Sequence, residues 1–258
     1  MITSPANERI KYVRSLYQGP ARRRERAFVI EGVRLVEEAL RSGVAPTLVL
    51  VDESTIERTA RGRELLGRLR RCHPLRVAEP VLKTVAGTVT PQGVVAVVPV
   101  PPATSIDPAG PLVIVLDGLS DPGNVGTILR TAWATGVVRT AVGLGAVDFY
   151  NPKVVRAASG AHFHLQLLAA EDWPPLRRQL AGRRLLVAAS VAGTPYYAAC
   201  WEQPLALVIG SEAHGVRPAI VAAAAELVQI PMPGGAESIN AAVAAGVLLF
   251  EAARHLVV

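Results

Sequence analysis

The chain has 258 residues, half of them hydrophobic, which is enough to bury the cores of two ordinary domains in a stable globular protein. Its net charge of +6 is uneven, because the first 83 residues carry 17 Lys and Arg against 10 Asp and Glu, whereas the remainder carries 10 against 11. Glycines and prolines interrupt the uncharged stretch 84–106, and the first residues are charged, so we expect neither a membrane span nor a secretory signal, but a cytoplasmic protein.

The first 98 residues alternate helical and strand-like patterns and predict a small α/β domain. Helices are expected near 7–17, over 33–41, over 57–71 and from 80, and strands over 27–31, 47–51 and 93–98. The positive charge is densest at Arg22, Arg23, Arg24 and Arg26. The planar fork of arginine suits phosphate oxygens, so these residues predict binding to a polyanion, most simply a nucleic acid. A solvated, arginine-rich surface is the alternative explanation.

Residues 99–111 are rich in proline and lack periodicity, which predicts a stiff linker between two domains. Beyond the linker, residues 112–258 again alternate two kinds of pattern. Apolar, strand-like runs lie at 112–116, 140–142, 185–189, 205–209 and 227–230, and helical patterns lie at 125–135, 152–159, 174–180, after 218 and at 240–255. This alternation predicts an α/β domain with a mostly parallel sheet and helices on both of its faces.

Three polar blocks follow apolar runs of this second domain: residues 117–130 (DGLSDPGNVGTILR), 209–215 (IGSEAHG) and 230–240 (IPMPGGAESIN). Open α/β sheets bind their ligands where strands end and helices begin, so the blocks together are a candidate active site. They lack both the dinucleotide-binding glycine fingerprint and the phosphate-binding loop. A nucleotide-dependent dehydrogenase or kinase therefore loses its usual support.

Each block also has an ordinary structural explanation. Asn124, Glu212 and either Ser238 or Asn240 are suited to cap the helices that follow them. Arg130 is a single arginine in an otherwise apolar helix, where such a residue commonly forms an ion pair or extends to solvent. Its place beside a glycine-rich turn also suits a grip on a phosphate or a reacting hydroxyl. Taken one at a time, the blocks leave both explanations open.

The cysteines and histidines give weak signals. Cys72 and Cys200 are far apart and have no partner motif, so neither a disulfide nor a metal pair is expected. His162 and His164 alternate along a strand-like run and could share a face, but two histidines without a third ligand are weak evidence for a metal site, and structural roles are favoured. We expect no bound metal.

Taken together, the three blocks resemble the SpoU/TrmH family of RNA ribose 2′-O-methyltransferases, a branch of the SPOUT superfamily. The resemblance rests on Asn124 to Arg130, on Gly210, Ser211, Glu212 and Gly215, and on Glu237 to Asn240 with the small-residue helix that follows. Residues 151–160 (NPKVVRAASG) are similar to the intermediate segment of the family. Residues 28–39 (FVIEGVRLVEEA) resemble a ribosomal-protein-like substrate-binding domain that many members carry. The resemblance covers nearly the whole chain.

The resemblance implies methyl transfer from S-adenosylmethionine to a ribose 2′-hydroxyl of RNA, with ribosomal RNA as the expected substrate and transfer RNA as the alternative. It implies a substrate-binding domain over residues 1–98, and a methyltransferase domain over 112–258 with a trefoil knot. It also implies a homodimer formed through the C-terminal domain. A non-catalytic RNA-binding protein of the same fold is the alternative function.

The resemblance also assigns residues to roles. The implied cofactor-binding residues are Leu207, Ile209, Gly210, Ser211, Glu212, Ile230, Met232, Ser238, Ile239 and Asn240. The implied catalytic residues are Arg130, Asn124, Glu212, Ser238 and Asn240, and the expected RNA-binding residues are Arg22, Arg23, Arg24, Arg26, Arg34 and Arg130. Because the pKa of arginine lies above about 12, we expect Arg130 to act on the 2′-oxygen as an electrostatic clamp and hydrogen-bond donor.

Overall fold

The computed structural model describes residues 1–102 and 105–256, which divide into two compact units. The first unit contains Met1–Pro101 and, from later in the chain, Tyr150–Phe163; the second contains the rest of the described residues. Residues 103 and 104 of the expected linker lie outside the described residues. The assignment of residues 1–98 to substrate binding, 99–111 to a linker and 112–258 to methyl transfer stays a prediction.

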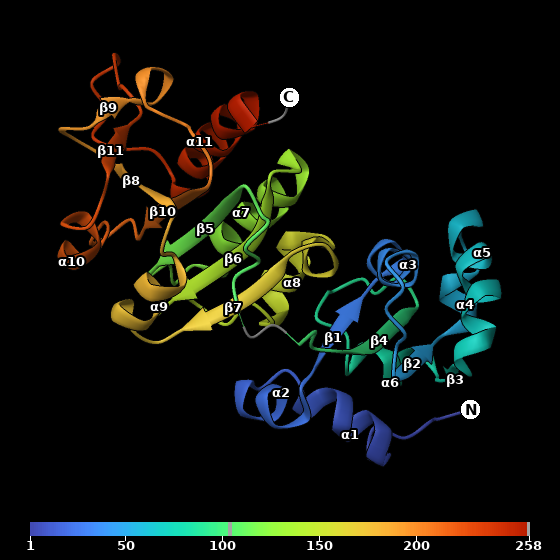
Figure 1. Cartoon of the computed structure of the whole chain (residues 1–258). Coiled ribbons are helices and arrows are strands. Elements are labelled where there is room, and N and C mark those ends of the chain that lie inside the picture. The colour runs from blue at the N-terminus through green and yellow to red at the C-terminus, as the bar shows by residue number, and fades with distance from the viewer. Residues whose placement is uncertain (103–104, 257–258) are drawn as a thin grey trace. The chain divides into compact units, whose positions relative to one another are not determined.

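The first unit is built on a four-stranded sheet in the order β1-β4-β2-β3 (Figure 1). Its strands are β1 (Ala27–Glu31), β2 (Leu48–Val51), β3 (Leu75–Arg76) and β4 (Val94–Pro99). Strand β4 is antiparallel to β1 and β2, whereas β2 and β3 are parallel. Its helices are α1 (Glu8–Ser15), α2 (Gly19–Glu25), α3 (Val33–Arg41), α4 (Glu53–Ile56), α5 (Ala60–Leu69), α6 (Glu79–Lys83) and α8 (Pro152–Ala158), with short 3-10 turns at Arg70–Cys72 and Ala161–Phe163.

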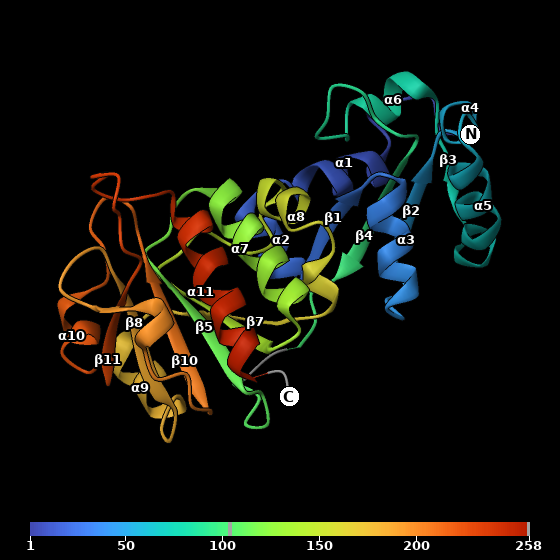
Figure 2. The same cartoon turned by 90° about the horizontal axis from the view of Figure 1, so that it is seen from above.

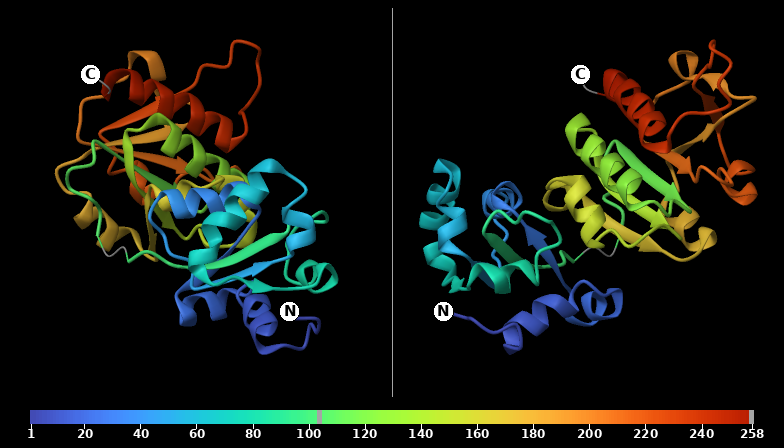
Figure 3. Two further views of the ribbon diagram at one scale, coloured as in Figure 1. Left: turned by 90° about the vertical axis from the view of Figure 1, so that its right-hand side faces the viewer. Right: turned by 180° about the vertical axis from the view of Figure 1, so that it is seen from behind.

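Both faces of this sheet are covered, because alternate residues of each strand enter two separate cores. Phe28 and Ile30 pack with side chains of α3, α5 and α8, whereas Ala27 and Val29 pack with side chains of α1 and α6. Figure 3 shows α1 and α2, in dark blue, on the side of the sheet opposite α3. The uninterrupted apolar runs of the sequence therefore mark strands that are buried on both sides.

The second unit has a seven-stranded sheet in the order β7-β6-β5-β10-β8-β11-β9. Its strands are β5 (Leu112–Asp117), β6 (Val138–Leu144), β7 (Gln166–Ala170), β8 (Arg184–Ala189), β9 (Thr194–Pro195), β10 (Leu205–Gly210) and β11 (Glu226–Gln229). Every neighbouring pair in it is parallel. The prediction of an α/β domain with a mostly parallel sheet is confirmed.

Helices cover both faces of this second sheet. They are α7 (Pro122–Thr135), α9 (Trp173–Gln179), α10 (Pro218–Val221) and α11 (Ala241–Leu256), with a 3-10 turn at Tyr196–Ala198. Side chains of α9 and α10 pack on one face in a core that includes Val113 and Val208. On the other face α7 and α11 lie side by side and contact each other along their lengths (Figure 2). The block 117–130, in which α7 begins, and the block 230–240, which α11 follows, are thereby brought together.

The helix predicted over residues 57–71 starts later than expected, because α5 begins at Ala60, and a separate helix, α4, ends at Ile56 before the predicted range. Asp52 caps α4, and Thr59 begins α5 by accepting a hydrogen bond from the Gly62 N–H at 3.0 Å. A side chain at Gly62 would collide with the carbonyl oxygen of Ile56, which lies 1.9 Å from where a Cβ would be. The cap at Thr59 therefore sets a later start for the predicted helix, and α4 lies outside the predicted elements. Helix α2 and strands β3, β7 and β9 were also outside the predicted elements.

His162 and His164 do not share the face of a strand. His162 is buried in a 3-10 turn of the first unit, with its ring 5.8 Å from that of Phe28. His164 belongs to the second unit and stacks on Trp133 at 4.3 Å. Over residues 1–102 and 105–256, no three His, Cys, Asp or Glu side chains are grouped as metal ligands, and no helix is long and apolar enough to cross a bilayer.

Candidate active site

The polar blocks begin at the carboxyl edge of the second sheet. Strands β5 and β10 are neighbours, and their register places Gly210 opposite Asp117, so the first two blocks leave the sheet side by side. The third block follows β11, which runs parallel to β8 in the same sheet. This is the edge at which parallel α/β sheets bind ligands. The fold therefore brings together three segments that lie far apart in the sequence.

An ion pair between a buried carboxylate and a partly exposed guanidinium fixes the first two blocks to the sheet edge. The Asp117 carboxylate is almost completely buried and lies 2.9 Å from Arg217 Nε, and it also accepts the Arg217 backbone N–H at 2.8 Å. The same guanidinium donates to the carbonyl oxygen of Leu144, at the end of β6. Sequence reasoning missed Arg217, because its only signal is a cation two residues after the second block. The Arg217 side chain connects the ends of β5 and β6 to the start of α10.

The second block closes into a tight turn. Ser211 and Gly215 exchange backbone hydrogen bonds of 3.2 and 2.9 Å, and the Ser211 hydroxyl accepts the His214 N–H at 3.2 Å. Gly215 has a φ of +66°, which favours glycine. The turn leaves Glu212 exposed at its tip and 6 residues ahead of α10. Glu212 is therefore not a helix cap.

The first block begins its helix earlier than its pattern suggests. Asp121, not Asn124, is the N-cap of α7, and its Oδ1 accepts the Asn124 N–H at 2.7 Å. The interpretation of Asn124 as the cap is wrong, because proline at the first helical position lets α7 start at Pro122. The Asn124 side chain is consequently free for another task in the first turn.

The third block ends with an asparagine that has two roles. Asn240 Oδ1 accepts the N–H groups of Ala242 at 2.9 Å and Val243 at 3.3 Å, so it caps α11. Its Nδ2 donates to Asn124 Oδ1 at 2.9 Å. Asn124 Nδ2 in turn donates to Glu212 Oε1. One chain of side-chain hydrogen bonds thus joins all three blocks, and we call Glu212, Asn124 and Asn240 the amide relay.

The relay has a fixed direction. A helix N-terminus offers only N–H groups, so the side chain of Asn240 must present its oxygen to α11 and its nitrogen to Asn124. Asn124 must then accept through its oxygen, which turns its own nitrogen toward Glu212. A carboxylate is the acceptor that this nitrogen needs. The start of α11 therefore determines how Glu212 is held, through two amides with no freedom to reverse.

Arg130 lies on the same helix as Asn124, about 9 Å further along the axis at 1.5 Å per residue. It is exposed, and within the described part of the chain its side chain makes no hydrogen bond or ion pair. Thr127 and Ala134 are exposed on the same stripe of α7. A guanidinium without partners, on the helix that also contains Asn124, is suited to bind an anion or a hydroxyl group of a substrate.

The expected cofactor-binding residues differ in access. Leu207 and Ile209 are buried within β10, where Leu207 pairs with Ile114 and Leu186, so their side chains belong to the core. Gly210, Ser211, Ile230, Met232 and Ile239 are half-buried, and Glu212, Ser238 and Asn240 are exposed. Among the described residues, Ser238 has no hydrogen-bond partner. The accessible members all lie in the turn after β10 and the segment after β11.

The structure changes the expectation for one arginine of the basic cluster. Arg22 is 5% exposed, and its Nη1 donates to the Leu16 carbonyl oxygen at 3.0 Å, so it supports the fold of the N-terminal helices. Arg23, Arg24 and Arg26 are exposed, with Arg24 paired to Glu25. We therefore do not expect Arg22 to contact RNA, because a buried guanidinium cannot reach a phosphate.

Two family models match the chain. The model described as the SpoU rRNA Methylase family matches residues 111–250, which include the three polar blocks. The model described as the MRM3-like substrate binding domain matches residues 7–96 of the first unit. The two matches together cover most of the chain.

Curated relatives match over nearly their whole length. The chain is 32% identical to the 23S rRNA (guanosine(2553)-2'-O)-methyltransferase RlmP of Bacillus subtilis, over 96% of this chain and 97% of that protein. It is also 32% identical to the 23S rRNA (uridine(2479)-2'-O)-methyltransferase of Streptomyces viridochromogenes, over 98% and 94%.

Solved structures agree with these matches. A crystal structure of an RNA 2'-O ribose methyltransferase covers 100% of this chain and 99% of its own, with 35% identity and a TM-score of 0.85. The SpoU methyltransferase AviRb from Streptomyces viridochromogenes, in complex with AdoMet, covers 97% and 99%, with 31% identity and a TM-score of 0.83.

Proposed function

This chain belongs to the SpoU rRNA methylase family, and we propose that it transfers the methyl group of S-adenosylmethionine to a ribose 2′-hydroxyl of ribosomal RNA. The observation that carries this proposal is the amide relay, which joins the three blocks in one place. The relatives named above act on a guanosine and on a uridine at similar identity to this chain. Membership of the family therefore does not determine which nucleotide this chain modifies.

The segments around the relay fit S-adenosylmethionine. Ile230, Met232 and Ile239 offer half-buried apolar surface, and Gly234 and Gly235 leave open space where side chains would stand. We propose that the turn after β10 and the segment 230–240 hold the cofactor, while Leu207 and Ile209 support the strand that presents the turn. When bound, S-adenosylmethionine supplies a methyl group on a cationic sulfur that leaves as a neutral thioether.

The reaction forms a bond between the 2′-oxygen and the methyl carbon, breaks the bond from that carbon to sulfur, and releases the hydroxyl proton. A ribose hydroxyl is a very weak acid, so catalysis requires alignment of the oxygen and stabilisation of its developing negative charge. Arg130 is suited to donate hydrogen bonds to that oxygen and to a neighbouring phosphate. We propose that Glu212, Asn124 and Asn240 position the segments that bind the cofactor. The Ser238 hydroxyl is a further hydrogen-bond donor in the third block.

We also propose that two copies associate through α11. Val243 and Phe250 are 55% and 58% exposed, and they stand seven residues apart on one face of this helix. Large apolar side chains exposed on one helix face suit packing against a second helix. Sedimentation should report a dimer for the wild-type chain and a monomer for Phe250→Glu; a wild-type monomer at all accessible concentrations would remove this proposal.

The trefoil knot implied by the family remains part of the proposal. The chain leaves β11 near one edge of the sheet, yet α11 packs on α7, beyond the intervening strands β8 and β10. A return of this kind is compatible with a threaded C-terminal segment. Threaded chains are rare, so this feature rests on the family and not on general folding rules.

The direct test is methyl transfer from labelled S-adenosylmethionine to a transcript of 23S ribosomal RNA. A 2′-O-methyl group protects the adjacent phosphodiester from alkali, so the label should appear in alkali-resistant dinucleotides. Label in mononucleotides would indicate base methylation and would contradict the proposal. A parallel reaction with transfer RNA transcripts tests the alternative substrate.

A further inference from the structure

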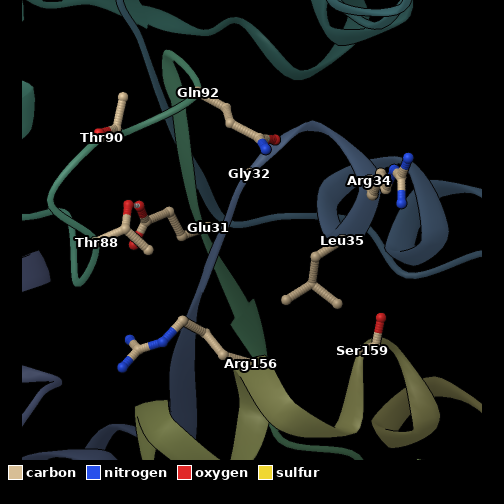
Figure 4. A pocket seen from close by; sticks show the side chains of 9 residues that line it. All are labelled: Glu31, Gly32, Arg34, Leu35, Thr88, Thr90, Gln92, Arg156 and Ser159. Carbon is tan, nitrogen blue, oxygen red and sulfur yellow. Dashed lines mark hydrogen bonds between the residues drawn. The ribbon is translucent and has the colours of Figure 1, made fainter.

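A hollow of about 260 Å³ lies in the first unit, and none of the residues that line it belongs to the three polar blocks (Figure 4). Its walls come from the turn between β1 and α3, from the loop that precedes β4, and from α8. The first two walls lie within the residues that match the substrate-binding model, whereas α8 comes from the segment 151–160. The function proposed so far gives this hollow no role.

Two arginines from different elements line the hollow. Arg34 is on the first turn of α3, and Arg156 is on α8. In the described part of the chain, neither guanidinium makes a hydrogen bond or an ion pair. Arg41 on the same helix α3 is instead paired with Glu38. The two cations of the hollow are thus uncommitted, whereas Arg41 and Arg61 of the same unit are paired.

The single carboxylate of the hollow is already occupied. Glu31 accepts the Gly87 N–H at 2.6 Å through one oxygen and the Thr88 hydroxyl through the other. A side chain at Gly87 would lie 2.4 Å from Arg156 Nη1, so the loop passes directly beside that guanidinium. Glu31 therefore holds the loop in place, and the ionisable groups of the lining sum to one positive charge.

The remaining polar groups of the lining are suited to donate hydrogen bonds. Gln92 Oε1 accepts the Val33 N–H at 2.9 Å, which leaves the amide nitrogen of Gln92 to face a ligand. The hydroxyls of Thr90 and Ser159 are exposed, and neither has a hydrogen-bond partner within the described residues. A ligand that supplies several acceptor oxygens and negative charge matches this set.

We propose that this hollow binds one nucleotide of the RNA backbone, with the guanidiniums of Arg34 and Arg156 contacting it from opposite sides of the hollow (Figure 4). The inference rests on the proposed function, which makes RNA the partner. Arginine forks match the oxygens of a phosphate, and charge-assisted hydrogen bonds of this kind are stronger than neutral ones. The volume lies just below the range of about 300–1,000 Å³ that holds drug-sized ligands, as expected for a site that takes one phosphate and its sugar.

The test measures the affinity of the full chain for a single-stranded RNA oligomer of mixed sequence over a series of salt concentrations. Arg34→Gln and Arg156→Gln should each lower affinity about ten-fold, and each should reduce the slope of log affinity against log salt by up to about 0.7. Because both side chains contact the same nucleotide, the double variant should lose less affinity than the product of the single losses. Independent contacts would instead give the full product.

Arg41→Gln is the matched control, since it removes the same charge from the same helix at a residue paired with Glu38. It should leave the salt slope unchanged. Arg34→Lys should keep the slope and lower the affinity, because the charge remains and the fork is lost. Melting curves of the Arg34 and Arg156 variants should match that of the wild type.

The two proposals fail in different ways. If the wild-type chain methylates ribosomal RNA but Arg34→Gln and Arg41→Gln change RNA affinity equally, the nucleotide site is wrong and the proposed function stands. The same conclusion follows if the losses in the double variant multiply. If the wild-type chain transfers no methyl group and binds no S-adenosylmethionine, the proposed function fails, and the nucleotide site fails with it.

Discussion

The two units arrange their polar groups in opposite ways. In the second unit Glu212, Asn124 and Asn240 are bonded to one another in a fixed order. In the first unit Arg34 and Arg156 lie on opposite sides of a hollow, and among the described residues neither guanidinium has a hydrogen-bond or ion-pair partner. Polar groups that hydrogen-bond to one another hold their positions before a ligand binds. Donors without partners instead form their hydrogen bonds with the ligand itself. We infer that the second unit fixes reaction geometry and that the first supplies charge for recognition.

The largest effect is expected at Arg130, an uncommitted guanidinium of the second unit. Arg130→Ala should lower the rate of methyl transfer by about 10²- to 10³-fold, the loss typical of removing a donor to a developing oxyanion. Calorimetry should show nearly unchanged binding of S-adenosylmethionine. Arg178→Ala, an exposed arginine on α9, is the control and should keep full activity. Wild-type rates for Arg130→Ala would remove this residue from the mechanism.

Asn240→Asp tests the direction of the relay. Aspartate caps helices as well as asparagine does, so the melting temperature should hold. However, its second oxygen would face Asn124 Oδ1, and the reversal of Asn124 that relieves this clash would turn an oxygen toward Glu212. We expect methyl transfer to fall about ten-fold, which corresponds to about 1.4 kcal/mol.

The matched variant for this test is Asn240→Ala, which should lose both the cap and the relay. It should therefore lower the stability by about 1 kcal/mol in addition to the rate. Full activity in Asn240→Asp would show that the relay is a packing feature without a role in the reaction.

Much of the second unit could be predicted from the sequence. Strands β5 and β10 are buried on both faces, so they read as uninterrupted aliphatic runs, and the positions of the polar blocks followed from the strand ends. The relay could not be predicted, because partner choice depends on whether Asp121 or Asn124 caps α7, and both residue types are good caps.

The hollow of the first unit was less accessible to sequence reasoning. It depends on residues 150–163 packing with a sheet more than 50 positions earlier in the chain, and no local pattern encodes such a contact. Arg34 was expected to bind RNA, whereas Arg156 appeared only inside a segment that resembles the family. Arg22 was expected to bind RNA but is buried, because a run of arginines does not reveal which of them points into the core.

A smaller effect is expected from the exposed arginines of the basic cluster, which should contribute charge for RNA binding as the first unit is inferred to do. Replacing Arg23, Arg24 and Arg26 together with glutamine should weaken RNA affinity and flatten its salt dependence, because fewer phosphate counterions are released. Arg22→Gln should instead destabilise the fold and leave the salt slope unchanged, since its guanidinium serves the Leu16 carbonyl. An equal change of slope in both variants would contradict this separation.

The smallest predicted effect concerns the support of the loop beside the hollow. Tyr17 donates to the Val85 carbonyl at 2.7 Å, and burial, followed by the charge of Glu31, raises the pKa of Tyr17 to about 12. Tyr17→Phe should lower the free energy of unfolding by about 1 kcal/mol.

Since the folded pKa of Tyr17 exceeds the ordinary value of 10.0, this stabilisation is complete below pH 10 and is lost as the pH rises toward 12. Urea denaturation of both proteins over this range should show the difference shrinking in alkali. A constant difference would mean that the hydroxyl is not the group responsible.

The central claim is that the ends of three strands form one site that holds S-adenosylmethionine within reach of Arg130. A crystal structure with the product S-adenosylhomocysteine tests it most directly. The product should lie against residues 210–215 and 230–240, with the relay intact and the Arg130 guanidinium on the same side. Density for the product at another edge of the sheet, or with Arg130 directed away from it, would contradict the account.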